Sequence, residues 1–328
     1  MKRCRVCSAA PIIELRQHNS AFCAEHLISF VHRQVERCIK KFDMFEPDAR
    51  ILVAVSGGKD SLALWDILHT LGYETEGLLI GLGIGEYSMN SANFARTFAA
   101  ERDLKLIEVD LASDHGFTVP EAAERTRRVP CSACGLSKRH IFDSTAIDGG
   151  FDVVVTGHNL DDEAAVLFGN VARWQSDYLG RQRPVLAATN GFPRKAKPLV
   201  RLSEREMAAY CVVRGIDYVV EECPMSAGNK HLAFKGILNQ MEVESPGAKH
   251  AFYFGFLERA AERFEFDLDG TDDESGDSEN GIGRCSECGS PSNGEVCAFC
   301  RLVAQVRPPT EVAIDTPSRD SIPTGEQV

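Results

Sequence analysis

The chain has 328 residues, 44% of them hydrophobic, and a formal net charge of −12 at pH 7. This length and apolar content suffice for one large globular domain with small appendages. No segment approaches the ~18 consecutive apolar residues of a membrane helix, and the N-terminus lacks the apolar region of a signal peptide. We therefore expect a soluble, cytoplasmic protein with no membrane partner. Twelve cysteines are too many for a reducing compartment unless they bind metal or perform redox chemistry.

The charge is unevenly distributed along the chain. Acidic side chains are concentrated in a Gly/Ser-containing segment, residues 266–283, which is typical of a solvated linker. Two other segments carry basic residues without acidic ones, namely Arg125, Arg127, Arg128, Lys138 and Arg139, and then Arg181, Arg183, Arg194, Lys195, Lys197 and Arg201. Local patches of this kind decide whether a phosphate backbone can dock. A solvated basic face explains either run about equally well.

The N-terminal segment, residues 1–30, contains two ligand pairs of the kind that hold metal. Two residues separate Cys4 from Cys7, and two separate Cys23 from His26. Three thiolates and an imidazole suit a closed tetrahedral zinc site. We predict a structural zinc module here, followed by a helix whose apolar residues recur at helical spacing from 31 to 42.

Residues 31–265 are predicted to form the main domain, because short apolar runs alternate there with helical patterns. The predicted strands are 51–55, 77–82, 104–111 and 151–156, and the predicted helices lie near 61–71, 90–101, 135–147 and 161–174. This alternation is typical of βαβ units. It predicts an α/β fold with a mostly parallel sheet and helices on both faces.

The rest of the main domain has a more helical pattern. Ser203 and Glu206 have the spacing of a helix-capping box. Residues 216–220 form a possible strand, and residues 230–264 are predicted to be helical with a break at 245–247.

A glycine-rich loop, Ser-Gly-Gly-Lys-Asp-Ser at residues 56–61, follows the strand 51–55 and precedes a helix. Backbone N–H groups and the helix dipole converge at such a turn and bind anions. Asp60 is best explained as a ligand for the Mg²⁺ that accompanies a nucleotide. The spacing is not that of the GxxxxGK[ST] loop, and it resembles the PP-loop of ATP pyrophosphatases. That resemblance implies attack of an acceptor oxygen on the α-phosphate of ATP; a simple tight turn is the alternative.

Two further strand ends would share the crevice that such a sheet forms at its carboxyl edge. Ile80 ends the second predicted strand and would offer backbone groups to adenine. Residues 157–162, Gly-His-Asn-Leu-Asp-Asp, follow the fourth and resemble the GHNxDD element of the same superfamily. The predicted nucleotide site is Ala54, Val55, Ser56, Gly57, Gly58, Lys59, Asp60, Ser61, Ile80, Gly157 and Asp162.

The C-terminal part of the chain carries a second set of four ligands, Cys285, Cys288, Cys297 and Cys300. Two CxxC knuckles joined by a short loop are typical of a structural zinc site, with rubredoxin-like iron as the alternative. We predict a zinc ribbon at residues 284–305 and a disordered tail at 306–328, which is rich in Pro, Thr and charge.

A third group of cysteines lies within the main domain. Cys131 and Cys134 form a CxxC pair in the first basic run, and Cys223 follows the possible strand at 216–220. Three thiolates can hold a [4Fe–4S] cluster and leave one iron open. From spacing alone, a catalytic persulfide or a redox pair is nearly as good an explanation. Cys38 and Cys211 fit helical apolar patterns and are predicted to be core residues.

In combination, these motifs make nearly the whole chain, up to about residue 305, similar to the TtuA-type tRNA 2-thiouridine synthetases. The motifs are the PP-loop, the PCxxCGxxKR run at 130–139, the GHNxDD element, a lone later cysteine and the terminal metal sets. The resemblance implies a Rossmann-like PP-loop domain, a homodimer, and a [4Fe–4S] cluster on Cys131, Cys134 and Cys223. It also implies tRNA as substrate and, as sulfur donor, a thiocarboxylated ubiquitin-like carrier protein or sulfide.

The implied reaction adenylates the C2 carbonyl of a uridine that has been flipped out of its stack, and sulfur then replaces the oxygen. Lys138, one helical turn beyond the CxxC pair, would neutralise charge at the α-phosphate. Asp60 and Asp162 would hold Mg²⁺, or Asp162 would assist proton transfer. A structural ion pair between Lys138 and Asp162 is the alternative. The sequence leaves open whether the target is the T-loop or the wobble uridine.

Two other functions compete with this one. An enzyme that thionates a small metabolite would need the same nucleotide site but no RNA. A zinc-ribbon RNA-binding module without catalysis would need no phosphate loop. Trp65 and Trp174 are predicted to lie in the core on helix faces and are assigned no function.

Overall fold

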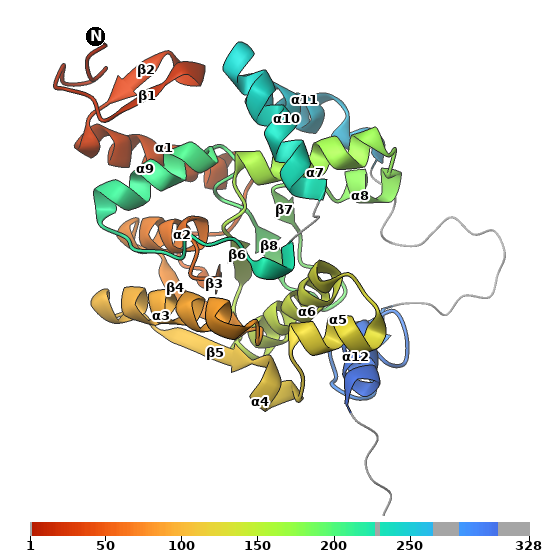
Figure 1. The fold of residues 1–328 in the computed structure, drawn as a ribbon. Coiled ribbons are helices and arrows are strands. Elements are labelled where there is room, and N and C mark those ends of the chain that lie inside the picture. Colours follow the sequence, from red (N-terminus) through yellow and green to blue (C-terminus); the bar gives the residue numbers. More distant parts are fainter. Residues whose placement is uncertain (1, 227–229, 265–281, 308–328) are drawn as a thin grey trace, which may run out of the picture.

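The computed structural model describes residues 2–226, 230–264 and 282–307 (Figure 1). Its centre is a six-stranded sheet with the strand order β5-β4-β3-β6-β8-β7. The strands are β3 (Arg50–Val55), β4 (Glu74–Gly81), β5 (Leu106–Asp110), β6 (Val153–Thr156), β7 (Val185–Leu186) and β8 (Arg194–Ala196). Among the described strands of this sheet, only the edge pair β7–β8 is antiparallel. The predicted α/β class with a mostly parallel sheet is confirmed.

The strand order determines where a ligand can bind. The chain moves outward from β3 to β4 and β5, and then returns to place β6 on the other side of β3. This reversal opens a crevice between β3 and β6 at their carboxyl ends. The phosphate loop leaves β3 and the GHNxDD element leaves β6, so the two motifs meet at that crevice.

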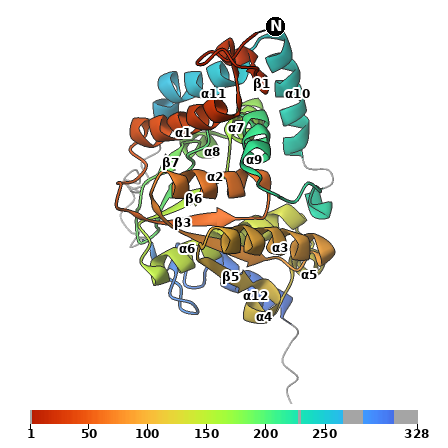
Figure 2. The same ribbon diagram turned by 90° about the vertical axis from the view of Figure 1, so that its left-hand side faces the viewer.

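Helices cover both faces of the sheet (Figure 2). Successive side chains of β3 alternate between the two cores, because a strand turns them to opposite faces: Ile51 and Val53 enter one core and Leu52 enters the other. The first core includes residues of α1 (Ala24–Lys41), α2 (Lys59–Thr70), α3 (Gly85–Glu101), α7 (Leu160–Ala172), α9 (Glu204–Arg214), α10 (Lys230–Glu244) and α11 (Ala248–Arg259). The second includes residues of α4 (Leu111–His115), α5 (Val119–Thr126), α6 (Pro130–Gly149) and α12 (Ala298–Val306).

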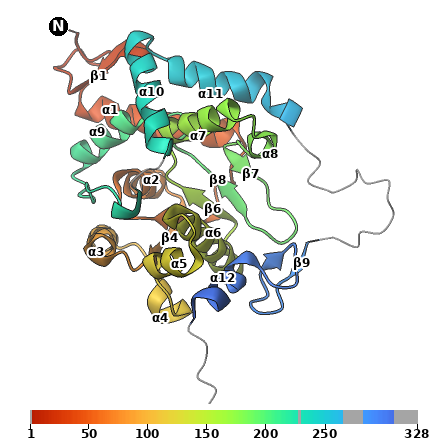
Figure 3. The same ribbon diagram turned by 45° about the vertical axis from the view of Figure 1, so that its right-hand side comes forward.

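Two small modules flank this domain. The N-terminal one is the hairpin of β1 (Ile13–Leu15) and β2 (Ser20–Phe22), with the 3₁₀ turn η1 (Arg16–His18) between its strands. The C-terminal one pairs β9 (Gly283–Arg284) with β10 (Pro291–Ser292) and ends in α12, which lies against α5 and α6 (Figure 3). Most of the predicted acidic linker, and the predicted tail beyond residue 307, lie outside the described residues.

Several local predictions are confirmed. Ser203 caps α9 in a capping box with Glu206, and the predicted break at 245–247 separates α10 from α11. In the described part of the chain, no helix has the length and apolarity to span a membrane.

Two local predictions are wrong. Residues 216–220 form no strand. Val219 instead donates one backbone hydrogen bond, 3.0 Å long, to the carbonyl of Gly57. Because Gly57 belongs to the phosphate loop and not to a strand, this bond does not continue into β-sheet pairing. Trp65 is fully buried as predicted, but Trp174 is 77% exposed. Helix α7 ends at Ala172, and Trp174 lies beyond it with a φ of +50°, so a helix-face argument does not apply there.

Candidate nucleotide and metal sites

The phosphate loop is fixed by hydrogen bonds within itself. The Ser61 hydroxyl donates to the Gly58 carbonyl at 2.9 Å and accepts from the Ser56 N–H at 3.1 Å. Gly57 has a φ of +73°, and a Cβ there would lie 2.2 Å from the carbonyl oxygen of Ser91. Only glycine tolerates both conditions, so the second residue of the motif is required by the close approach of α3.

The GHNxDD element packs directly on the phosphate loop. A Cβ on Gly157 would lie 2.9 Å from the backbone of Asp60 and Ser61. The two motifs, about a hundred residues apart in sequence, therefore come into close backbone contact at Gly157. Their contact forms the floor of a cavity of about 300 Å³.

This cavity contains most of the predicted nucleotide residues. Its lining includes Ala54, Val55, Ser56, Asp60, Ser61, Ile80 and Gly157, together with the predicted catalytic Lys138. Gly58 and Lys59 line a neighbouring cavity of about 840 Å³ instead. Gly57 and Asp162 line neither. A cavity that is bounded by a phosphate loop and lined by both polar and apolar side chains suits a nucleotide.

Sequence reasoning missed one wall of the nucleotide cavity. Tyr87, Ser88 and Ser91 of α3 line it, as does Phe142 of α6. The position of α3 in the sequence could have revealed this wall. Helix α3 begins soon after Ile80, at the end of β4, and the carboxyl ends of the strands are where such a sheet binds its ligand. His158 also lines the cavity and exchanges a 2.7 Å hydrogen bond with Thr156; burial lowers its pKa.

Asp60 has the properties of a cation ligand. Its Oδ1 is buried and has no hydrogen-bond partner among the described residues. Burial raises the pKa of Asp60 to about 6, against the pull of Lys59, and the charge of Asp162 raises it further. A buried, unsatisfied carboxylate oxygen beside a phosphate loop fits Mg²⁺, which is bound through one or two carboxylates and substrate phosphates.

Asp162 is paired, but not with Lys138. Its Oδ1 lies 2.6 Å from Nζ of Lys235 in α10, and its Oδ2 accepts from the N–H of Asn159 at 3.1 Å. Burial would raise the pKa of Asp162, but His231 and Lys235 lower it well below its ordinary value. The side chain is thus held ionised, whereas no ion pair of Lys138 is found in the described part of the chain.

A chain of alternating charges runs behind the phosphate loop. Glu204, at the start of α9, lies 2.6 Å from Nζ of Lys59 and 3.5 Å from Nζ of Lys235. Lys59 also lies 3.2 Å from Asp60. Burial would lower the pKa of Lys59, but Asp60 and Glu204 raise it above its ordinary value. Both lysines therefore stay protonated, and α9 and α10 hold the predicted magnesium ligands in place.

The three cysteines of the main domain converge beside this cavity. Cys131 and Cys134 lie in the first turns of α6, and Sγ of Cys131 is 3.9 Å from the carbonyl of Met225, two residues beyond Cys223. Burial raises the pKa of Cys134, and the neighbouring Cys223 and Cys131 raise it further against the pull of Lys138. Cys38 and Cys211 are buried in the core, as predicted.

The spacing of these three sulfur atoms differs from that of the terminal sets. Among the described residues, four-ligand groups with all ligand atoms within 4.8 Å occur at the two termini, and the three central thiols do not form such a group. A cluster of four irons is larger than one ion and needs its thiolates further apart. Three converging thiols with looser spacing fit a cluster better than a single metal ion.

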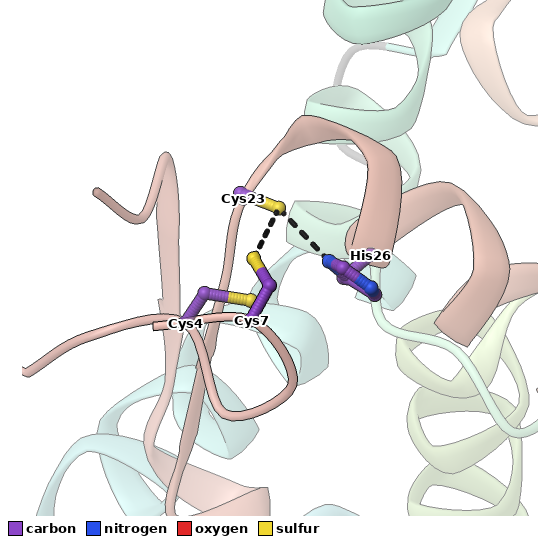
Figure 4. Close-up of side chains that lie close together, drawn as sticks. All are labelled: Cys4, Cys7, Cys23 and His26. Atoms are coloured by element: carbon purple, nitrogen blue, oxygen red, sulfur yellow. Dashed lines mark hydrogen bonds between the residues drawn. The ribbon is translucent and has the colours of Figure 1, made fainter. Parts of the chain in front are cut away.

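The N-terminal set is arranged for one tetrahedral ion (Figure 4). Sγ of Cys23 lies 3.7 Å from Sγ of Cys7 and 3.1 Å from Nδ1 of His26. A metal–sulfur bond of ~2.3 Å implies a sulfur–sulfur edge of about 3.8 Å in a tetrahedron. Burial would raise the pKa of Cys4, but backbone N–H groups, foremost that of Cys7, lower it to about 6.

The C-terminal set repeats this design. Sγ of Cys288 lies 3.8 Å from Sγ of Cys297. Burial would raise the pKa of Cys285, but backbone N–H groups, foremost that of Cys297, lower it to about 6. Both sets therefore present ligand geometry and a ready thiolate that fit Zn²⁺.

Comparisons with known proteins identify the family of this chain. The PP-loop domain model matches residues 29–228, and the model of the N-terminal LIM domain of the 2-thiouridine synthetase TtuA matches residues 3–28. The tRNA-5-methyluridine(54) 2-sulfurtransferase of Thermus thermophilus is 48% identical over 299 residues, which cover 91% of this chain and 90% of the relative. Its namesake from Pyrococcus horikoshii is 39% identical over 92% of this chain and 93% of the relative.

A solved structure shares the fold. The U34-tRNA thiolase NcsA from Methanococcus maripaludis, determined with its [4Fe-4S] cluster, superposes with a TM-score of 0.74 at 24% identity and covers 92% of this chain and 95% of its own. The chain therefore belongs to the TtuA family of 2-thiouridine synthetases, which is built on a PP-loop domain.

Proposed function

We propose that this protein is an ATP-dependent tRNA 2-sulfurtransferase that converts uridine or 5-methyluridine at position 54 to its 2-thio form. The observation that carries the proposal is the position of α6. Its Lys138 lines the nucleotide cavity, and its Cys131 and Cys134 converge with Cys223 next to it. One helix thus joins the group that would stabilise an adenylated substrate to the thiols that would handle sulfur.

The proposed reaction balances without a change of oxidation state. The C2 oxygen of the flipped-out uridine attacks the α-phosphate of ATP, and the bond to pyrophosphate breaks. Sulfur at the sulfide level then attacks C2, the C2–O bond breaks, and AMP leaves with the oxygen. Residues 56–61 would hold the phosphates, Asp60 and Asp162 would hold Mg²⁺, and Lys138 would neutralise the charge that develops at the α-phosphate.

The three central thiolates would hold the [4Fe–4S] cluster. This assignment is supported by their convergence and by the cluster named for the Methanococcus maripaludis structure. When bound, such a cluster supplies an iron position that no protein ligand occupies and that can bind sulfide. The protein keeps the thiols next to the nucleotide cavity. Burial raises the pKa of Cys134, so this thiol keeps its proton until a bound metal displaces it.

Several finer features belong to the same proposal. The two terminal sets would hold one Zn²⁺ each, in structural roles. The sulfur donor would be a thiocarboxylated ubiquitin-like carrier protein or free sulfide, and the enzyme would be a homodimer. Position 54 is favoured over position 34 because the relatives named for it are more similar to this chain than the wobble-specific neighbour.

Metal analysis of anaerobically purified protein tests the cluster. Cys131→Ala, Cys134→Ala and Cys223→Ala should each lose about four irons and keep the zinc of the wild type, whereas Cys211→Ala, a buried core control, should keep both metals. Iron-free wild-type protein that still thiolates tRNA would rule out the cluster and favour a persulfide on these cysteines.

The two halves of the reaction can be separated by variants. Lys138→Ala should lower tRNA-dependent pyrophosphate release by roughly 10²–10³-fold, while the neighbouring Arg139→Ala should change it little. Cys131→Ala should still release pyrophosphate but form no 2-thiouridine. Mass spectrometry of nuclease fragments should place the sulfur at position 54; sulfur at position 34 would correct the target. Full activity on a small amide without RNA would favour the metabolite reading instead.

A further inference from the structure

The two basic runs of the sequence differ in how many of their side chains form internal hydrogen bonds and ion pairs. In the second run, Arg194 donates to the backbone carbonyl of Asp43 at 2.6 Å, Lys195 pairs with Asp143 at 2.6 Å, and Lys197 pairs with Glu163 at 2.8 Å. Arg201 donates to Gln34 at 3.0 Å. Most of this run therefore holds β8 and the following segment to the domain and is not free to bind an anion.

The first run contains two adjacent arginines whose side chains have no partner among the described residues. Arg127 and Arg128 are exposed, and neither side chain makes a hydrogen bond or ion pair within residues 2–226, 230–264 and 282–307. Arg125, one turn earlier, differs because its guanidinium donates to the carbonyl of Val306 in α12. Arg127 has a φ of +54°, a left-handed conformation that is unusual for a residue other than glycine. It turns the chain sharply between α5 and α6.

This turn lies at the thiol end of the site. Val129, which follows the two arginines, is 69% exposed, and Cys131, two residues further, is exposed as well. The same helix then carries Lys138 into the nucleotide cavity. The turn is therefore joined directly to the helix that carries two of the thiols and Lys138.

We propose that the α5–α6 corner, defined as Arg127, Arg128 and Val129, is the docking surface for the tRNA strand next to the target nucleotide. The two guanidiniums bind phosphodiester oxygens, for which their paired N–H groups are well shaped. The Val129 side chain packs on the base or ribose that is uncovered when the target uridine leaves its stack. This proposal rests on the proposed function, because it takes the partner to be RNA.

Binding of unmodified tRNA measured at several salt concentrations tests the surface. Arg127→Gln/Arg128→Gln should weaken binding roughly tenfold near 0.1 M salt and lower the slope of log K against log salt by about 1 for each arginine removed. The KM for tRNA should rise in parallel. The matched control is Arg181→Gln, which removes one exposed arginine just beyond α8 (Ser176–Gly180); it should change Kd less than twofold, against at least threefold for Arg128→Gln alone. Thermal unfolding would verify that all variants are folded.

The contrary outcomes are distinct. Wild-type affinity and salt slope in the double variant, or an equal loss in Arg181→Gln, would overturn the surface while leaving the enzymatic proposal intact if the wild type thiolates tRNA. Wild-type tRNA affinity, combined with a loss of activity only when a protein carrier replaces free sulfide as donor, would assign the corner to the carrier and overturn the RNA proposal. A wild type that binds tRNA but never thiolates it would contradict the proposed function and not the surface.

Discussion

The two terminal modules carry similar four-ligand sets but contact different parts of the candidate site. The N-terminal hairpin contacts the nucleotide side of the domain, where His18 lies 3.4 Å from Glu206 in the capping box of α9. The C-terminal ribbon contacts the thiol side, where Phe299 stacks on His140 of α6 with ring centroids 4.1 Å apart. Helix α9 holds Lys59 through Glu204, and α6 carries Cys131, Cys134 and Lys138. Similar modules thus contact helices that carry different groups of predicted site residues.

The largest effect is expected when the buried aromatic residue that anchors each module is removed, and this change tests the comparison directly. Phe299 and Phe22 are 3% and 4% exposed, so Phe299→Ala and Phe22→Ala should each lower the free energy of unfolding by about 3–5 kcal/mol. Phe299→Ala should also lower the iron content of anaerobic protein, because it removes the contact with α6. Chemical denaturation and metal analysis measure the two effects. Equal iron loss in both variants would mean that the modules stabilise the whole domain without distinction.

A smaller effect is expected at the helix cap on the nucleotide side. Ser203→Ala removes the side-chain acceptor of the α9 cap and should cost about 1 kcal/mol of stability. Thr118→Ala is a matched control, because Thr118 forms the same kind of capping box in α5. Isothermal titration should show weaker ATP binding for Ser203→Ala than for Thr118→Ala, since Glu204 follows that cap directly. Identical affinities would separate α9 from nucleotide binding.

The smallest effect concerns pH. Burial, aided by the charge of His115, lowers the pKa of His140 to about 4. An unfolded chain, whose histidine titrates near 6.5, then binds more protons than the folded chain between these values, so stability falls as pH decreases from 6.5 towards 4. At pH 6 the loss is under about 1 kcal/mol. His140→Phe keeps an aromatic ring against Phe299 and should flatten the pH dependence of thermal unfolding; an unchanged dependence would place the titration elsewhere.

Much of this protein was determined by short-range sequence features. The phosphate loop, the two four-ligand sets, the helix cap at Ser203 and the alternating apolar runs each depend on residues close together in the chain. Backbone geometry and ligand spacing act over a few residues, so these features can be predicted without knowing the rest of the fold.

The tertiary structure alone decided which distant side chains meet. Asp162 pairs with Lys235 rather than with Lys138, and Glu204 bridges two lysines of different helices. The second basic run largely forms internal pairs, while the arginines of the α5–α6 corner have no partner among the described residues. Trp174 is exposed because α7 ends before it. Such pairings depend on where separate helices pack on the sheet, and no periodicity within one segment encodes the distance between two charges on different elements.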